Sequence, residues 1–300
     1  MKQIKFYYPF NEKISRAMHR VRDALMNYAP EGVIFTDNLE SGCIHIIDYI
    51  GQHPTIEDRL LWQEKSLFPV PSLPKTEKYI IIQHTINEHY KELQNEYHKL
   101  MKNALLIISH NPYMKEFDDL NYCVTPWGYD PNIFNRKNLR REYTVLVTGY
   151  DPISEAIIDM YEACKRINGK MMHVGGYVGL LTNQWYSHCE GISDELMAEL
   201  YNKSFFVNGI RREGGFELPI IEGLACGCRP IIIDHPYFTY WFKDVARIVP
   251  NTTGEEFISA LANELRKPAF VSAHEYSFIQ KFTWKNVMKK LWKRIMEEIK

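Results

Sequence analysis

Short apolar runs alternate with helical stripes along the chain. The apolar runs predict strands, which fall at 4–8, 32–35, 43–50, 78–84, 104–109, 143–149, 170–176, 205–209, 229–233 and 245–250. Between them, apolar residues at helical spacing predict a helix, with Ile14, Ala17, Met18, Val21 and Leu25 on one face. A polar helix is expected near 87–103, and further helices are expected near 153–167 and 192–204. Strands that alternate with helices favour parallel sheets covered on both faces.

Two such sets of strands and helices predict two domains. We expect the α/β class, with two Rossmann-like doubly wound domains facing a central cleft. The turn-rich, charged stretch 124–142 marks the boundary, so the domains are expected at 1–127 and 128–283. The last helix, within 284–300, is expected to pack back on the first domain through one apolar face, formed by Trp284, Val287, Met288, Leu291, Trp292 and Ile295.

Composition narrows the class of protein. The 300 residues are 45% hydrophobic and 24% charged, with a net charge of −1, so no overall charge draws the chain to nucleic acid or membrane. No apolar run reaches the ~18 residues of a membrane span, and no signal peptide is recognised, so we expect a cytoplasmic protein without a transmembrane segment. The six cysteines are scattered, which is typical of reduced thiols and disfavours a zinc site.

One stretch, "RREGGFELPIIEGLACGCRPIII" at 211–233, places glutamates among glycines, a proline and an apolar run. Buried carboxylates are costly unless they are hydrogen-bonded. A helix that begins near Pro219 presents free N–H groups and a positive dipole end, which suit a diphosphate. Glu222, one turn inside that helix, is placed to accept hydrogen bonds from ribose hydroxyls. The alternative is that Glu222 caps the helix or pairs with Arg229.

The same stretch resembles the signature of glycosyltransferase family 4 (glycosyl transferases group 1), which are retaining, nucleotide-sugar-dependent enzymes of the GT-B fold. The matching positions are Phe216, Leu218, Pro219, Glu222, Ala225, Gly227, Pro230 and Ile231. The segments 124–134 and 192–219 also resemble the family, in the expected order. The resemblance implies a hexosyltransferase-type enzyme that uses a nucleoside-diphosphate sugar as co-substrate. It implies no other cofactor and no metal, and the sequence contains no Asp-x-Asp.

The resemblance assigns the site residues. It implies catalytic roles for His84, at the end of an apolar strand, and for Glu213. It implies donor binding by Arg211, Arg212, Gly214, Gly215, Phe216, Glu217, Leu218, Glu222, Gly149 and His173, with His173 expected to be packed rather than catalytic.

Two departures from the family pattern bear on this assignment. An extra glycine moves Glu213 one residue upstream of its usual place, which leaves Glu217 as a competing contact to the sugar. Tyr150 and Glu155 stand where the family carries the two cations that hold the diphosphate. Arg211 and Arg212 are the best substitutes, because a guanidinium binds phosphate in a bidentate manner.

The acceptor and the reaction stay open at this level. A surface glycan, a lipid-linked sugar and a modified DNA base are the acceptors that the basic segment 1–25 suggests. The alternative is that this segment is a solvated helix face. The basic face of 285–294 suggests peripheral membrane contact, although docking on the first domain explains it more simply. The alternatives to a transferase are an epimerase-like isomerase of the same fold and a non-catalytic nucleotide-sugar-binding protein.

Overall fold

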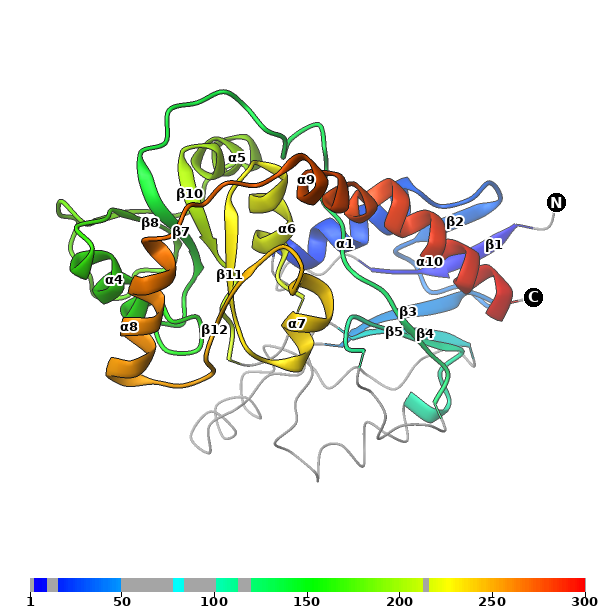
Figure 1. Ribbon diagram of the computed structural model, residues 1–300. Helices are drawn as coiled ribbons and strands as arrows, with labels where there is room; N and C mark the ends of the chain where they lie inside the picture. Colours follow the sequence, from blue (N-terminus) through cyan, green and yellow to red (C-terminus); the bar gives the residue numbers. More distant parts are fainter. Residues whose placement is uncertain are drawn as a thin grey trace. The chain divides into compact units, whose positions relative to one another are not determined.

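The chain forms two units, whose elements are labelled in Figure 1. The computed structural model describes residues 3–9, 16–49, 78–83, 101–112, 120–212 and 216–299. The first unit comprises Met1–Trp127, Gly214–Phe216 and Trp284–Lys300, and the second comprises Gly128–Glu213 and Glu217–Thr283.

The first unit is built on a parallel sheet. In the described residues its strands are β1 (Ile4–Tyr7), β2 (Val33–Thr36), β3 (Ile44–Tyr49), β4 (Tyr79–Gln83), β5 (Leu106–Ser109) and β6 (Tyr122–Val124), in the order β2-β1-β3-β4-β5-β6. Every residue of β4 and β5 is buried, as their unbroken apolar sequence predicts for inner parallel strands.

Two helices from opposite ends of the sequence pack together in this unit: α1 (Arg16–Asn27) and α10 (Trp284–Glu298) (Figure 1). The buried residues of α10 are the six that the helical spacing predicts for its apolar face. Trp292 joins the two helices, because its indole N–H donates to the Leu25 carbonyl over 3.0 Å. Its ring also lies edge-on to Phe6, with centroids 5.5 Å apart.

The second unit has its own parallel sheet. Its strands are β7 (Tyr143–Gly149), β8 (Met171–Gly175), β9 (Tyr186–Cys189), β10 (Ser204–Asn208), β11 (Arg229–Ile233) and β12 (Arg247–Val249), in the order β12-β11-β10-β7-β8-β9. The chain therefore moves outward from β7 in one direction through β8 and β9. It then returns to the other side of β7 and moves the opposite way through β10, β11 and β12.

This reversal places helices on both faces of the sheet. Right-handed crossovers in opposite directions put the helix after β7 and the helix after β10 on opposite faces. The helices of the unit are α4 (Ile157–Arg166), α5 (Asp194–Asn202), α6 (Leu218–Ala225), α7 (Pro236–Phe242), α8 (Gly254–Leu265) and α9 (Ala273–Ile279), followed by the 3₁₀ turn η2 (Gln280–Phe282). In Figure 1, α4 packs against α8, and α5 packs against α6.

Local sequence explains where two of these helices begin. Ser193 is the N-cap of α5, because its hydroxyl accepts from the Leu196 amide over 3.2 Å. Pro219 lies in the first turn of α6, where its missing N–H costs nothing. Both starts agree with the sequence, and the predicted class, two Rossmann-like α/β sets of parallel strands, is confirmed.

Candidate donor-binding site

The strand order of the second unit reverses between β7 and β10. In doubly wound sheets, ligands bind outside the carboxyl ends of the strands at such a reversal. Hydrogen bonds join the end of β10 and its loop to the segment that follows β7. The side-chain amide of Asn208 donates to the Glu155 carbonyl over 2.8 Å, and the backbone N–H of Arg212 donates to the Ser154 carbonyl over 2.8 Å. The predicted donor residues after β7 and β10 therefore lie at one place in the fold.

Arg211 lies between two carboxylates at this reversal. Its Nη2 is 3.1 Å from Glu155 Oε1, and its Nη1 is 3.4 Å from Glu217 Oε2. The pKa of Arg211 is raised above its usual value, first by Glu217 and then by Glu155, while burial opposes them. The side chain of Arg211 is 30% exposed, against 5% for Glu155, so the guanidinium is the more accessible partner of that pair.

Glu155 holds its carboxylate against the loop that follows β7. Its Oε2 accepts hydrogen bonds from the backbone N–H groups of Tyr150 and Asp151, each over 2.7 Å. Burial raises the pKa of Glu155, and Arg211 and the two amides only partly offset this effect. A pair of successive amides of this kind is an anion-binding feature, and here it binds an anion that the chain itself supplies. Sequence reasoning treated Glu155 only as a missing cation and did not anticipate this contact.

Gly149 ends β7 beneath that carboxylate. Its φ is +123°, and a Cβ at this position would lie 2.0 Å from Glu155 Oε2. Glycine is therefore required both by the backbone conformation and by the close approach.

His173 on β8 supports the end of β7 from within the core. Its Nε2 lies 3.0 Å from the Gly149 carbonyl, and its Nδ1 lies 2.8 Å from the Tyr186 hydroxyl. Because a carbonyl can only accept, Nε2 carries the proton and Nδ1 accepts from Tyr186. Burial lowers the pKa of His173, which favours this neutral form. The side chain is fully buried, and it contacts the end of β7 through the Gly149 carbonyl.

Arg212 points away from its neighbour Arg211. Its guanidinium lies over the Phe257 ring of α8, 4.7 Å from the centroid, and its Nη2 is 3.8 Å from Asp159 Oδ2 on α4. The two arginines expected to replace the family cations thus lie in different surroundings. Arg211 alone of the two shares contacts with Glu155 and Glu217.

The helix α6 begins directly after these contacts. Glu217 is its N-cap residue, but its side chain makes no capping hydrogen bond and is directed to Arg211 instead. Glu222 is 3% exposed, and the Tyr201 hydroxyl lies 3.5 Å from its Oε2. Arg229, the alternative partner of Glu222, pairs with Glu275.

Two other predicted residues are packed. Phe216 is 6% exposed and Leu218 is 5% exposed, so both side chains are buried. The predicted residues His84, Glu213, Gly214 and Gly215 lie outside the described residues.

Neither a metal site nor a membrane span is found in the part of the chain that the structure describes. There, no three side chains of His, Cys, Asp or Glu come together in a group that could hold a metal ion. Of the described helices, none combines the length and the hydrophobicity needed to cross a bilayer.

Solved structures similar to this one are glycosyltransferases. HepE from Anabaena, in its complex with UDP, is 11% identical, with a TM-score of 0.66 over 99% of this chain and 100% of that one. Its complex with UDP-glucose gives a TM-score of 0.65 over the same shares. The fold is that of the GT-B glycosyltransferases.

Two further structures agree on this fold. AviGT4, a glycosyltransferase involved in avilamycin A biosynthesis, is 11% identical, with a TM-score of 0.58 over 99% of this chain and 98% of that one. Sucrose-phosphate synthase from Thermosynechococcus elongatus is 14% identical, with a TM-score of 0.63 over 85% of this chain and 73% of that one. No protein-family model and no curated protein matches the sequence.

Proposed function

We propose that this protein is a glycosyltransferase that moves a sugar from a nucleoside-diphosphate sugar to a hydroxyl acceptor. The observation that carries the proposal is the meeting of Arg211, the loop after β7 and the start of α6 at the strand reversal of the second sheet. Support comes from the GT-B fold, shared along nearly the whole chain with a protein solved with UDP-glucose.

In this proposal the donor diphosphate lies against the N-terminal turn of α6, where the helix dipole and Arg211 both favour negative charge. The same groups stabilise the charge that develops on the leaving nucleoside diphosphate, which is catalysis by electrostatic preorganisation. The transfer would retain the anomeric configuration and need no metal. Glu222 would accept from the ribose hydroxyls, and His84 and Glu213 would act at the transferred sugar.

Glu155 constrains how such a donor binds. It neutralises part of the charge of Arg211 and occupies the amides of Tyr150 and Asp151. The diphosphate would therefore take the exposed side of the guanidinium, or exchange with one of its carboxylates.

The first experiment is calorimetric binding of UDP and UDP-glucose, with GDP and ADP for comparison, to the full chain and two variants. Loss of a hydrogen bond to a charged group costs about 1.5–3 kcal/mol, so Arg211→Gln should weaken binding by roughly tenfold to a hundredfold. Arg212→Gln is the matched control and should change binding by less than about threefold, because its guanidinium packs on Phe257. If each nucleotide binds equally well to all three proteins, the placement of the diphosphate beside Arg211 is refuted.

The second experiment measures release of the nucleoside diphosphate from the sugar nucleotide that binds. Release that depends on an added acceptor, and that persists with EDTA, supports a metal-independent transferase. The anomeric configuration of the product then decides whether the transfer is retaining.

A non-catalytic nucleotide-sugar-binding protein is the second candidate, and the carboxylate of Glu155 at the amides after β7 favours it. In that case the donor binds, but no nucleoside diphosphate is released with any glycan, lipid or DNA acceptor. An isomerase would instead convert the donor sugar without an acceptor.

A further inference from the structure

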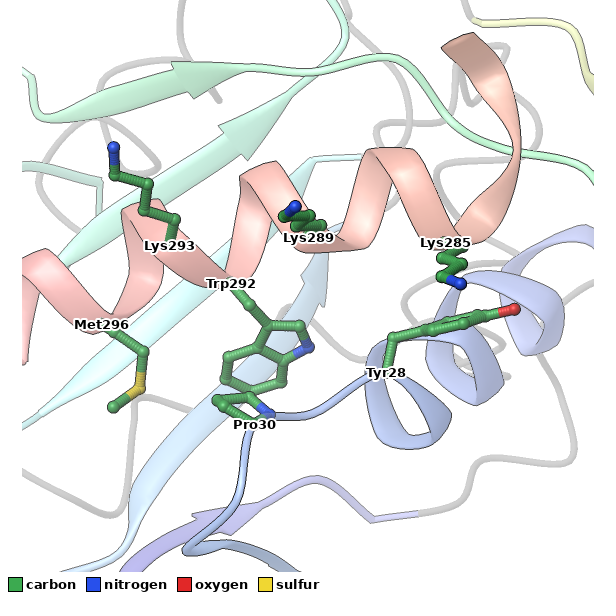
Figure 2. A pocket seen from close by; sticks show the side chains of 7 residues that line it. All are labelled: Tyr28, Pro30, Lys285, Lys289, Trp292, Lys293 and Met296. Atoms are coloured by element: carbon green, nitrogen blue, oxygen red, sulfur yellow. The ribbon is translucent and has the colours of Figure 1, made fainter. Parts of the chain in front are cut away.

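A pocket of about 380 Å³ lies on the first unit, beside α10 and the end of α1, at a place that the proposed function does not use. Figure 2 shows the side chains that line it: Tyr28, Pro30, Lys285, Lys289, Trp292, Lys293 and Met296.

The inner part of the pocket is apolar and held in place by the core. Trp292 is 3% exposed, and its indole N–H is already bonded to the Leu25 carbonyl, so the ring offers a ligand only apolar surface. Pro30 lies beside the indole in Figure 2, with Met296 one helical turn further along α10. Tyr28 lies at the outer edge, 42% exposed.

The outer part is basic. Lys285, Lys289 and Lys293, called here the lysine row, are spaced by four residues and are all exposed. The lining includes no acidic residue. In the described residues the lysine row forms no ion pair, whereas Lys203 on α5 pairs with Glu199 over 2.8 Å. Like charges at i,i+4 destabilise a helix, so the spacing of the lysine row does not itself stabilise α10.

The combination points to one kind of ligand. Apart from the lysine ammonium groups and the Tyr28 hydroxyl, the lining side chains offer no free hydrogen-bond donor. Apolar side chains beside lysines are typical of surfaces that bind at a lipid interface. Because the net charge of the chain is only −1, the attraction comes from this local group.

We propose that this pocket docks the protein on a membrane surface that carries anionic phospholipid. The lysine row binds the phosphate groups, and Tyr28 and Met296, which line the pocket with the buried Trp292, contact the apolar part of the lipid beneath the headgroup. This inference does not rest on the proposed glycosyl transfer, since its residues lie outside the donor-binding site. Each lysine near an anionic surface contributes about fivefold to binding, so the lysine row contributes on the order of a hundredfold.

The test is co-sedimentation of the full chain with vesicles of phosphatidylcholine, with and without phosphatidylglycerol. The unaltered protein should bind the anionic vesicles and not the neutral ones. Lys289→Glu should lower the partition coefficient by more than about fivefold. Lys290→Glu is the matched control, because Lys290 is also exposed on the same helix but does not line the pocket. It should lower the coefficient by less than about twofold. Tyr28→Ala, at an exposed edge, should weaken binding without loss of helical signal.

Three outcomes would overturn the proposal. One is an absence of binding to the anionic vesicles. Another is an equal loss in the Lys289 and Lys290 variants, which would indicate general charge attraction rather than this pocket. The third is binding of polyphosphate as tight as that of vesicles and equally sensitive to Lys289→Glu, which would assign the lysine row to a soluble polyanion.

Discussion

Arg211→Ala tests the charge arrangement of the candidate site without any assumption about the ligand. It removes the cation that lies 3.1 Å from Glu155, whose side chain is 5% exposed, and 3.4 Å from Glu217, whose side chain is 15% exposed. Breaking a fully buried ion pair costs about 3–5 kcal/mol, because a charge is left behind in the interior. Since Arg211 itself is 30% exposed, water weakens the pair, and we expect the free energy of unfolding to fall by about 2–3 kcal/mol near pH 8.

The loss should depend on pH in a defined direction. Burial already raises the pKa of Glu155 above 4.5, and Arg211 opposes that shift, so the variant should have a still higher pKa. Between the ordinary value and this raised value, the folded variant binds a proton that the unfolded chain releases, and its stability falls as the pH rises. As the pH falls from 8 toward 5, more of the variant's Glu155 carboxyl is protonated, so the difference from the unaltered protein should shrink.

The assay is urea unfolding at the two pH values, with hydrogen exchange of the β7 and β10 amides to identify the transition of the second unit. Arg211→Ala combined with Glu155→Gln should recover more than half of the loss, because the buried charge leaves with its partner. Arg212→Ala is the control and should show no comparable dependence on pH. A loss that is the same at both pH values, or a double variant as unstable as the sum of the single ones, would refute this account of Arg211.

Two further outcomes follow from the same region. Gly175→Ala should destabilise the second unit by more than about 3 kcal/mol in thermal unfolding, because its Cβ would lie 1.7 Å from the Gly149 carbonyl oxygen. Gly179 is the control: its φ is +81° and the space around it is open, so Gly179→Ala should cost about 1 kcal/mol. If the two variants are destabilised equally, the close approach of position 175 to the Gly149 carbonyl is refuted. If a nucleoside diphosphate binds beside Glu155, its negative charge should raise the pKa of that carboxyl further, so binding should take up protons and tighten as the pH falls toward about 5. Calorimetry in buffers of different ionisation enthalpy measures this proton uptake. An uptake of zero would indicate that the phosphate does not bind beside Glu155.

Periodicity predicted those parts of the fold in which one face or a whole strand is apolar. The inward face of α10 and the seven residues of β7 agree with the sequence, because their apolar spacing leaves one way to bury them. The strand β9 was not anticipated, since its sequence Tyr-Ser-His-Cys has no apolar run. Its residues pair with β8 through the backbone, which a hydropathy pattern does not register.

The sequence indicated the elements on which the candidate site lies, but not the contacts that its side chains make. The glycines, the proline and the glutamates of 211–233 indicate a strand, a loop and a helix start at the edge of a parallel sheet, and that prediction depends only on local chemistry. The direction of a long side chain depends on tertiary neighbours. Arg211 and Arg212 look equivalent in sequence, yet one meets Glu155 and the other lies over Phe257. Likewise, the close contact of Glu155 with Gly149 depends on the exact course of the loop after β7.

At the strand reversal, the groups that could bind an anion already contact carboxylates of the chain itself. Arg211 contributes one positive charge, and Glu155 and Glu217 contribute two negative ones within 3.4 Å of it. A diphosphate adds further negative charge, so its proposed binding beside Arg211 would be favoured if a carboxylate moved away or took up a proton. Of the two, Glu155 is better suited to take up a proton, because burial already raises its pKa. Glu217 is better suited to move, because it is the N-cap residue of α6 and its side chain makes no capping bond. If phosphate replaced Glu217 beside Arg211, Glu155 would remain to orient Arg211 toward the ligand. Glu155, which stands where the family carries a cation, would then be a positioning residue for Arg211, the cation that binds the phosphate in its place.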